Sequence, residues 1–262
     1  MKSAVVLLSG GLDSATTLYV ARSRGHRCTC LIVDYGQRHR KEVRAARRIA
    51  RAAGCPAQVA RVRFPWGGSA LTDRRLRVPT RRTLKEIGRG IPATYVPARN
   101  TIFLSLALGF AEATGAQAVF IGATAIDYSG YPDCRPAYYR QMQRVARLGT
   151  KAGAQGRGIR IVTPLIRKTK AEIIRMGRRL GVPFHLTWSC YLGGKRPCGR
   201  CDSCLLRAKG FRQAGLPDPA AVVIRSRRLI AEAEADVRKG RHPDPERSEG
   251  EGSGLERRDS SA

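Results

Sequence analysis

Residues 2–34, KSAVVLLSGGLDSATTLYVARSRGHRCTCLIVD, decide the fold of this chain. Lys2–Leu8 is a short apolar run that predicts a buried strand, and Cys28–Asp34 predicts a second one. Between them, Ala15–Arg24 has the residue spacing of a helix. A strand, a helix and a second strand in this order are typical of a parallel sheet with helices on its faces.

The same alternation continues through most of the chain. Further helices are predicted at Arg38–Ala53, Asn100–Thr114, Pro136–Leu148 and Thr169–Leu180, and further strands at Ala57–Val62, Ala118–Gly122 and Ile159–Thr163. Phe64–Pro92 interrupts the pattern because it is rich in Arg, Gly and Pro, and we interpret it as a mobile insertion over one end of the sheet. The sequence therefore predicts an α/β fold, doubly wound around a mainly parallel five-stranded sheet.

Length and composition limit the class of protein. The chain has 262 residues, with 49 Lys and Arg against 20 Asp and Glu and a formal charge of +29. It is long enough for a large domain with a core, which we assign to residues 1–219. The sequence contains no run of 18 apolar residues and no secretory signal, so we expect a cytoplasmic protein without a membrane span.

The positive charge lies in residues 1–219 and is mostly arginine spread over every segment. An anionic partner such as a nucleotide or a nucleic acid would account for it. Because no single long basic run forms, we favour general composition as the explanation and expect no obligatory nucleic-acid partner. Residues 220–262 are neutral overall, with a helix expected near 225–238, and this tail is predicted to be largely disordered.

The loop Ser9-Gly10-Gly11-Leu12-Asp13-Ser14 follows the first predicted strand directly and opens the first helix. Its two glycines allow the backbone to approach a phosphate, and its serine hydroxyls and the helix N-terminus add hydrogen-bond donors. The loop matches neither the Gly-x4-Gly-Lys-Ser/Thr motif nor the Gly-x-Gly-x-x-Gly motif. An ordinary tight turn with a Ser or Asp cap is the alternative, but the pattern favours a phosphate site.

Four cysteines are spaced as a metal site. Cys190, Cys198, Cys201 and Cys204 follow the pattern C-x7-C-x2-C-x2-C within a segment that we bound at residues 187–210. Cytosolic cysteines more often bind metal or do thiol chemistry than form disulfides, and four thiolates suit a closed, structural zinc site. An iron–sulfur cluster also takes four cysteines, and unrelated free thiols are the remaining alternative. We expect a C-terminal segment held together by one Zn²⁺.

Further polar residues stand beyond the carboxyl ends of predicted strands, where parallel sheets bind ligands. Asp34 ends the second strand, and Arg38 follows it. Arg99 precedes the most apolar helix, where its charge would lie next to anions bound at the first loop. Lys168, before a later helix, could meet a phosphate or a carboxylate, although a simple helix cap explains this segment equally well.

The loop Asp127–Pro136, DYSGYPDCRP, follows the fourth predicted strand. Its aromatic rings can stack on a purine-like base, and its carboxylates can accept hydrogen bonds from ring N–H groups. A rigid, turn-rich loop is the alternative, and the position beyond a strand end favours a ligand role. Cys134 in this loop is a minor candidate for contact with the chemistry.

The pattern at Ser9–Ser14 resembles the pyrophosphate-binding loop of the N-type ATP pyrophosphatases. Further segments in one order extend the resemblance to the 7-cyano-7-deazaguanine synthases of queuosine biosynthesis, over about residues 1–219. These segments are Asp34–Glu42, Val96–Asn100, Asp127–Pro136, Thr163–Leu165 with Lys170–Ile173, and Ser189–Tyr191 with Cys198–Arg207. The chain departs from the family pattern at Ala137, where an acidic residue is usual, and in the tail after Pro219.

The resemblance implies an enzyme with an adenine nucleotide alpha hydrolase-like fold. Such an enzyme would use ATP and ammonia to convert 7-carboxy-7-deazaguanine to 7-cyano-7-deazaguanine, from carboxylate to amide to nitrile through adenylated intermediates. The resemblance also implies Mg²⁺ and a homodimer. From the residues and the resemblance together, we predict a catalytic set, a nucleotide-binding set and a substrate-binding set. The predicted catalytic residues are Ser9, Asp13, Ser14, Arg99 and Lys168. The predicted nucleotide-binding residues are Leu8, Ser9, Gly10, Gly11, Leu12, Asp13, Ser14, Ala15, Thr16, Thr17, Leu18, Asp34 and Arg38. The predicted substrate-binding residues are Asp127, Tyr131, Asp133 and Arg135.

Two other functions compete with this prediction. A tRNA-thiolating enzyme of the same superfamily would suit the zinc and the basic charge, but it would need a domain that reads the RNA. A zinc-containing nucleic-acid-binding protein would also suit the charge, but the chain lacks a clustered basic run and aromatic stripes.

Overall fold

The computed structural model describes residues 1–125 and 130–220. In this part of the chain, five parallel strands form one sheet in the order β3-β2-β1-β4-β5. The predicted parallel sheet is therefore confirmed. The strands are β1 (Ser3–Leu7), β2 (Arg27–Asp34), β3 (Ala57–Arg61), β4 (Ala118–Ile121) and β5 (Arg160–Val162).

Alternate side chains of each central strand fill two cores, one on each face of the sheet. In β1, Ala4 and Val6 belong to one core, whereas Val5 and Leu7 belong to the other. Strands that are buried on both faces are apolar throughout and lack an alternation with polar residues. This explains the continuous apolar run at the start of the chain.

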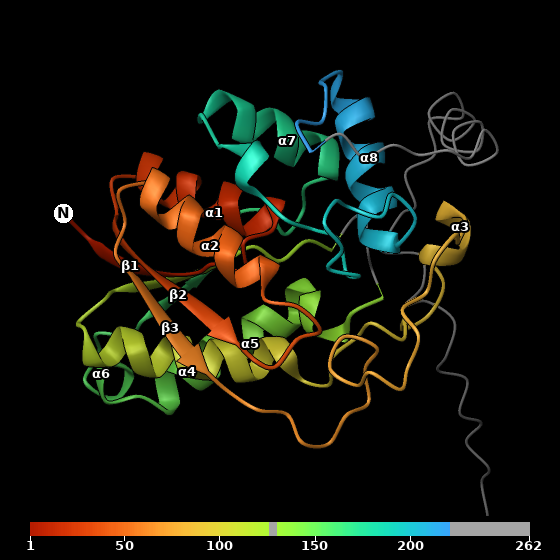
Figure 1. The fold of residues 1–262 in the computed structure, drawn as a ribbon. Coiled ribbons are helices and arrows are strands. Elements are labelled where there is room, and N and C mark those ends of the chain that lie inside the picture. Colours follow the sequence, from red (N-terminus) through yellow and green to blue (C-terminus); the bar gives the residue numbers. More distant parts are fainter. Residues whose placement is uncertain (126–129, 221–262) are drawn as a thin grey trace, which may run out of the picture.

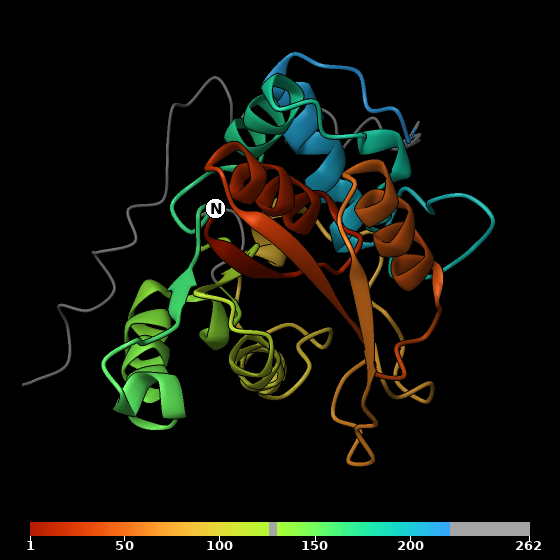
Figure 2. The same ribbon diagram turned by 90° about the vertical axis from the view of Figure 1, so that its left-hand side faces the viewer.

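Helices cover both faces, as predicted for a doubly wound sheet. One face carries α1 (Leu12–Ser23), α2 (Lys41–Ala52) and α7 (Lys170–Arg179), with α8 (Asp202–Ala214) packed against α7. The other face carries α4 (Arg99–Ala113) and α5 (Pro136–Leu148), followed by the short α6 (Lys151–Ala154), as Figures 1 and 2 show. Within the described ranges, no helix is long and apolar enough to span a membrane.

Three helices begin at other residues than predicted. The first starts at Leu12 and not at Ala15, because the extended Gly11 already serves as its N-cap. The second starts at Lys41, after Arg40 as its N-cap, and the backbone N–H of Arg38 before it is bonded to Leu71 O at 3.1 Å. Helix α4 starts at Arg99 and not at Asn100, directly after Ala98, which has a left-handed φ of +52°. Loop residues beside the sheet edge thus replace the predicted first turn of α2, whereas α1 and α4 start earlier than predicted.

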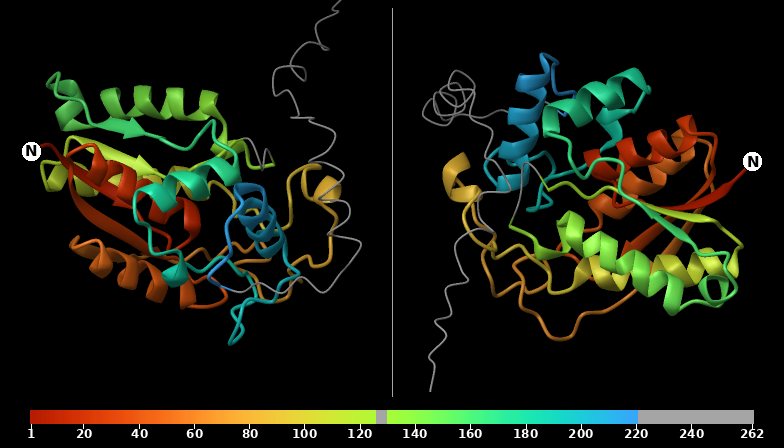
Figure 3. Two further views of the ribbon diagram at one scale, coloured as in Figure 1. Left: turned by 90° about the horizontal axis from the view of Figure 1, so that it is seen from above. Right: turned by 180° about the vertical axis from the view of Figure 1, so that it is seen from behind.

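The stretch 64–92 corrects our prediction of a mobile insertion. It contains a short helix, α3 (Leu84–Ile87), and runs beside α8, as Figure 3 shows. Arg38 Nε donates to Ala70 O at 2.5 Å, and Thr80 forms an isolated antiparallel bridge with Cys201. The segment is therefore fixed between the sheet edge and the cysteine cluster. The predicted helix near 225–238 and the rest of the tail lie outside the described residues.

Arg82, from this stretch, neutralises a carboxylate buried at the start of α8. Asp202 is 1% exposed, and its carboxylate is paired with the Arg82 guanidinium. Removal of one partner leaves a buried charge without compensation, which costs roughly 3–5 kcal/mol. We expect Arg82→Ala to lower the free energy of unfolding by about 3 kcal/mol in urea denaturation, and Asp202→Asn in that background to restore part of it. Equal stability of the single variant and the wild type would contradict the pairing.

Candidate active site

A cavity of about 290 Å³ opens at the carboxyl ends of β1, β2 and β4. The winding direction of the chain reverses between β1 and β4, and ligand crevices of open parallel sheets form at such a point. The structure thus gathers predicted groups that are far apart in the sequence. Those that line the cavity are Leu8, Ser9, Gly11, Leu12, Asp13, Ser14, Arg99 and Tyr131.

The Ser9–Ser14 loop turns its backbone toward the cavity. Gly10 has a φ of +87°, and a Cβ at this position would lie 2.3 Å from the carbonyl oxygen of Glu42, so α2 packs directly behind the loop. Ser14 Oγ accepts from Ser9 N at 3.2 Å and donates to Gly11 O at 3.1 Å. The first turn of α1 then offers N–H groups that lack intrahelical partners, as in phosphate sites at helix N-termini.

The four predicted nucleotide-binding residues at positions 15–18 lie behind the loop. Ala15, Thr16, Thr17 and Leu18 are all fully buried in α1. Thr16 Oγ1 donates to Leu12 O at 3.0 Å, within the helix. These residues do not line the cavity, so they support the loop from the core.

Asp13 is held by a lysine that starts α7. Lys170 Nζ lies 2.7 Å from both carboxylate oxygens of Asp13, and both residues line the cavity. A capping box of Thr169 and Glu172 fixes the start of α7 and hence the direction of Lys170. Lys168, the lysine predicted from the sequence, precedes the helix and does not line the cavity. The structure therefore places Lys170 where Lys168 was expected.

Arg99 also lines the cavity, at the first position of α4. Burial acts to lower the pKa of its guanidinium, but Tyr35 and Tyr131 nearby outweigh that effect and raise the pKa. The side chain is therefore a permanent positive charge in a site with little water. A fixed charge in such a place binds and orients anions more strongly than the same charge in water.

Asp133 holds the start of α4 in place. Its Oδ2 accepts from the backbone N of Asn100 at 3.1 Å, and its carbonyl oxygen accepts from Asn100 Nδ2 at 3.0 Å. Asp133 is 5% exposed and does not line the cavity. We predicted a substrate contact for Asp133. The structure instead makes Asp133 the acceptor for the first turn of the helix.

Three further predicted residues lie away from the cavity wall, and a fourth is not described. Asp34 Oδ2 is 3.5 Å from Arg40 Nε at the end of β2. The Arg38 guanidinium, predicted to bind the nucleotide, donates instead to the carbonyls of Ala70 and Asp73. Arg135 is exposed before α5. Asp127 lies outside the described residues.

Reasoning from the sequence missed several groups in the cavity wall. Glu42 lies on the first turn of α2, within the predicted helix Arg38–Ala53, in which we had named only Arg38 as a site residue. Arg207 is 4% exposed and is bonded through Nε and Nη2 to the carboxylate of Asp218. Trp188 precedes the cysteine cluster. The rarity of acids in this chain was the signal that could have singled out Glu42.

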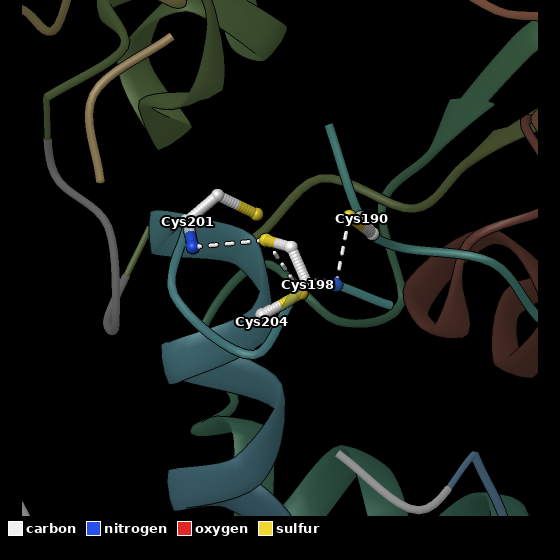
Figure 4. A group of neighbouring side chains, drawn as sticks. All are labelled: Cys190, Cys198, Cys201 and Cys204. Carbon is white, nitrogen blue, oxygen red and sulfur yellow. Dashed lines mark hydrogen bonds between the residues drawn. The ribbon is translucent and has the colours of Figure 1, made fainter. Parts of the chain in front are cut away.

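The four predicted cysteines meet in one cluster, shown in Figure 4. All four sulfur atoms lie within 4.8 Å of one another, and Cys198 Sγ is 3.9 Å from Cys204 Sγ. Sulfur atoms at the corners of a zinc tetrahedron are about 3.8 Å apart, given Zn–S bonds of about 2.3 Å. Backbone N–H groups of Cys198 and Cys201 donate to cluster sulfurs at 3.4 and 3.3 Å. The donor set fits a closed tetrahedral metal ion.

The short segment 188–190 connects the cysteine cluster to the Ser9–Ser14 loop. Trp188 N donates to Gly10 O at 2.9 Å, and Trp188 Nε1 donates to Cys190 O at 2.8 Å. His39 Nε2 is also 2.9 Å from Cys190 O. The hydrogen bonds of residues 188–190 therefore tie the position of the Ser9–Ser14 loop to that of the cysteine cluster.

A comparison of two lysine variants tests the assignment at α7. We expect Lys170→Met to lower kcat/KM for nucleotide about 100-fold, because it removes a charge from the cavity and leaves Asp13 unpaired. Lys168→Met should cost no more than about threefold, since Lys168 does not line the cavity. Initial rates at several nucleotide concentrations give both values. The reverse order of effects would support the lysine predicted from the sequence.

Comparison with known proteins finds relatives over most of the chain. A family model described as queuosine biosynthesis protein QueC matches residues 3–215. A 7-cyano-7-deazaguanine synthase from Nostoc punctiforme is 56% identical over 219 residues, which cover 82% of this chain and 97% of the relative. Relatives of the same name from Anaeromyxobacter sp. and Cyanothece sp. are 56% and 57% identical. Their matches cover 85% and 82% of this chain and 97% of each relative.

Proposed function

The chain belongs to the QueC family of queuosine biosynthesis proteins, and from this premise we propose that it is an ATP-dependent carbon–nitrogen ligase. It takes 7-carboxy-7-deazaguanine and ammonia to 7-cyano-7-deazaguanine, first forming the amide and then the nitrile. The relatives are named as synthases of that product, so the chain is an enzyme of this family. The observation that carries the detailed chemistry is the Ser9–Ser14 loop in the wall of the cavity at the switch point of the sheet.

Activation through the α-phosphate of ATP explains why such a loop is needed. A carboxylate oxygen is a poor leaving group, whereas AMP is a good one. The N–H groups of the loop and of the first turn of α1 would hold the departing pyrophosphate and stabilise the charge that develops on it. Burial raises the pKa of the Cys134 thiol to about 12, which keeps it neutral and argues against a thiolate nucleophile. Positioning and fixed charge would supply most of the acceleration.

The charged groups divide between the two ends of the nucleotide. Lys170 and Asp13 lie at the loop, next to the proposed site of the outer phosphates. Arg99 lies opposite, where the acid and the α-phosphate would react. The Asp13 carboxylate supplies the kind of oxygen ligand that Mg²⁺ prefers, and this ion, when bound, would offset the negative charge of the phosphates. The proposed catalytic set is therefore Ser9, Asp13, Ser14, Arg99 and Lys170.

The deazapurine would lie against the aromatic side of the cavity. Tyr131 lines this side, and its ring centroid is 5.6 Å from that of Tyr95. Such a pair offers a face on which a flat base can stack. Asp127 is the proposed acceptor for its ring N–H groups, while Asp133 shapes the loop through Asn100. Ala137 follows this loop at the start of α5, so the acid that is usual in the family does not contribute here.

The remaining parts of the proposal concern the metal and the assembly. The cysteine cluster would hold one Zn²⁺ with a structural role, because all four positions of a tetrahedral ion are taken by sulfur. We propose a homodimer, as the resemblance implied, and a cytoplasmic location and turnover without nucleic acid, as the composition and charge distribution predicted.

Mass spectrometry of a single reaction mixture tests the function. Purified protein with ATP, Mg²⁺, ammonium and 7-carboxy-7-deazaguanine should form the nitrile, and omission of ATP or ammonium should abolish it. Omission of ammonium should leave an ATP-dependent release of pyrophosphate. Turnover of ATP without nitrile or amide, together with steeply salt-dependent binding of tRNA, would contradict the proposal.

A further inference from the structure

A second carboxylate, that of Glu42, lines the cavity. Among the described residues, Asp13 and Glu42 are the acids in its wall, against the cations Arg99, Lys170 and Arg207. Both oxygens of Asp13 are bonded to Lys170. The side chain of Glu42 has no hydrogen bond or ion pair within residues 1–125 and 130–220. Among the residues that the structure describes, Glu42 is therefore a carboxylate in the cavity wall that has no hydrogen-bond or ion-pair partner.

Glu42 lies where the loop and the opposite wall meet. The backbone carbonyl of Glu42 packs behind Gly10. Its side chain is close enough to Arg99 for that charge to shift the pKa of Glu42, and close enough to Tyr35 for Glu42 to shift the pKa of that tyrosine. Burial raises the pKa of Glu42 to about 7, an effect that Arg99 opposes. A carboxyl group in this range can take up and release a proton near neutral pH.

An unpaired acid works against the binding of both substrates of the proposed reaction, because ATP and a carboxylate are anions. Its presence in the cavity wall therefore has to serve a group that carries positive charge or N–H protons. The reaction creates such a group when ammonia adds to the carbonyl carbon of the acyl adenylate. The same nitrogen must later lose its remaining protons for the nitrile to form.

We propose that Glu42 is the proton acceptor for the reacting nitrogen in both stages, an inference that rests on the proposed function. In the first stage, ammonia attacks the carbonyl carbon of the acyl adenylate, and the C–O bond breaks with its electron pair leaving on AMP. The added nitrogen then gives one proton to Glu42, which leaves the amide. Glu42 returns that proton to water before the next step.

The second stage needs the same acceptor. The amide oxygen displaces pyrophosphate from a second ATP, which gives an O-adenylated imidate whose nitrogen carries two protons. The nitrogen gives the first proton to Glu42, which passes it to water and then accepts the second, and AMP departs with the C–O electron pair as the C≡N bond forms. A single carboxylate beside the reacting carbon thus accounts for three proton transfers from one nitrogen atom. No oxidant or further reactant is required.

Glu42→Gln separates proton transfer from adenylation. The variant keeps the size of the side chain but cannot accept a proton, so ammonia-dependent nitrile formation should fall at least about 100-fold. Hydroxylamine, a strong nucleophile that is largely uncharged at neutral pH, traps the acyl adenylate as a hydroxamate without such help. Hydroxamate formation by the variant should stay within about threefold of the wild type. When the amide is supplied as substrate, its conversion to nitrile should fall as steeply as the overall reaction.

Two further variants serve as controls for Glu42→Gln. Glu112→Gln makes the same change on α4, at a carboxylate that accepts from Ala152 N and does not line the cavity, and should leave all three rates unchanged. Glu42→Asp, which keeps a carboxylate, should recover part of the ammonia-dependent rate. Unchanged nitrile formation by Glu42→Gln would overturn the inference. An equal loss of hydroxamate would also overturn it, because Glu42 would then serve adenylation or Mg²⁺. Failure of the wild type to give hydroxamate or nitrile would instead overturn the proposed function.

Discussion

Replacement of Gly10 by alanine is expected to lower kcat/KM for ATP by 1000-fold or more. A Cβ at this position would lie 2.3 Å from Glu42 O and 2.8 Å from Ala46 N, which are backbone atoms of α2 that cannot turn aside. The φ of +87° adds strain for any residue with a side chain. The loop would have to move away from α2, and its N–H groups would no longer converge on the phosphates. Shifts of about 1 Å at a catalytic site can cost 100-fold by themselves.

Gly25 offers a matched control for the strain alone. It has a φ of +76° in the turn after α1, but no atom lies within 4 Å of a Cβ placed there. Gly25→Ala should therefore destabilise the fold by about 1 kcal/mol and leave the rate unchanged. Nucleotide binding by calorimetry and initial rates distinguish the two variants. A Gly10→Ala protein with nearly normal ATP affinity would show that the loop does not hold the nucleotide.

Loss of one cysteine of the cluster is expected to have the second large effect. Cys201 is fully buried, packs against Ala70 and Val78, and forms the bridge to Thr80. Cys201→Ser should remove the metal and lower the free energy of unfolding by at least about 3 kcal/mol, since metal binding and folding are coupled. For a domain of this size, that corresponds to a fall in Tm of roughly 10 °C.

The variant should also bind ATP more weakly, because residues 188–190 connect the cluster to Gly10. Metal analysis, thermal unfolding and nucleotide titration of the same preparation measure the three effects. Cys55→Ser is the matched control: Cys55 is half-buried beside the core of α1 and α2, and its loss should change neither metal content nor affinity. Full stability of the Cys201→Ser protein, or of the wild type after removal of its metal with EDTA, would contradict a structural metal.

Local patterns were enough to predict the sheet, the Ser9–Ser14 loop between β1 and α1, and the cysteine cluster. In each case the signal is contained within a few neighbouring residues, such as the two glycines after β1 or the two C-x2-C spacings. The family resemblance rested on the same segments, and the relatives confirm it. Expectations of this kind hold because short-range sequence fixes short-range geometry.

Roles that depend on long-range contacts were not predictable in the same way. Arg38 looked like a phosphate ligand, but the carbonyls of Ala70 and Asp73 take up its donors. Asp133 looked like a base contact, but the first turn of α4 lacked an acceptor and lies next to it. Lys168 and Lys170 differ by two residues, and only the start of α7 decides which of them meets Asp13. These contacts join residues that lie up to 157 positions apart.

The fate of the two carboxylate oxygens tests the central claim most directly. The acid is prepared with ¹⁸O in both carboxylate positions and converted with unlabelled ATP, and the nucleotide products are separated and weighed by mass spectrometry. Our account predicts two molecules of AMP for each nitrile, each with one ¹⁸O, and pyrophosphate without label. ADP as the nucleotide product, with ¹⁸O in inorganic phosphate, would show attack at the outer phosphate and contradict the account.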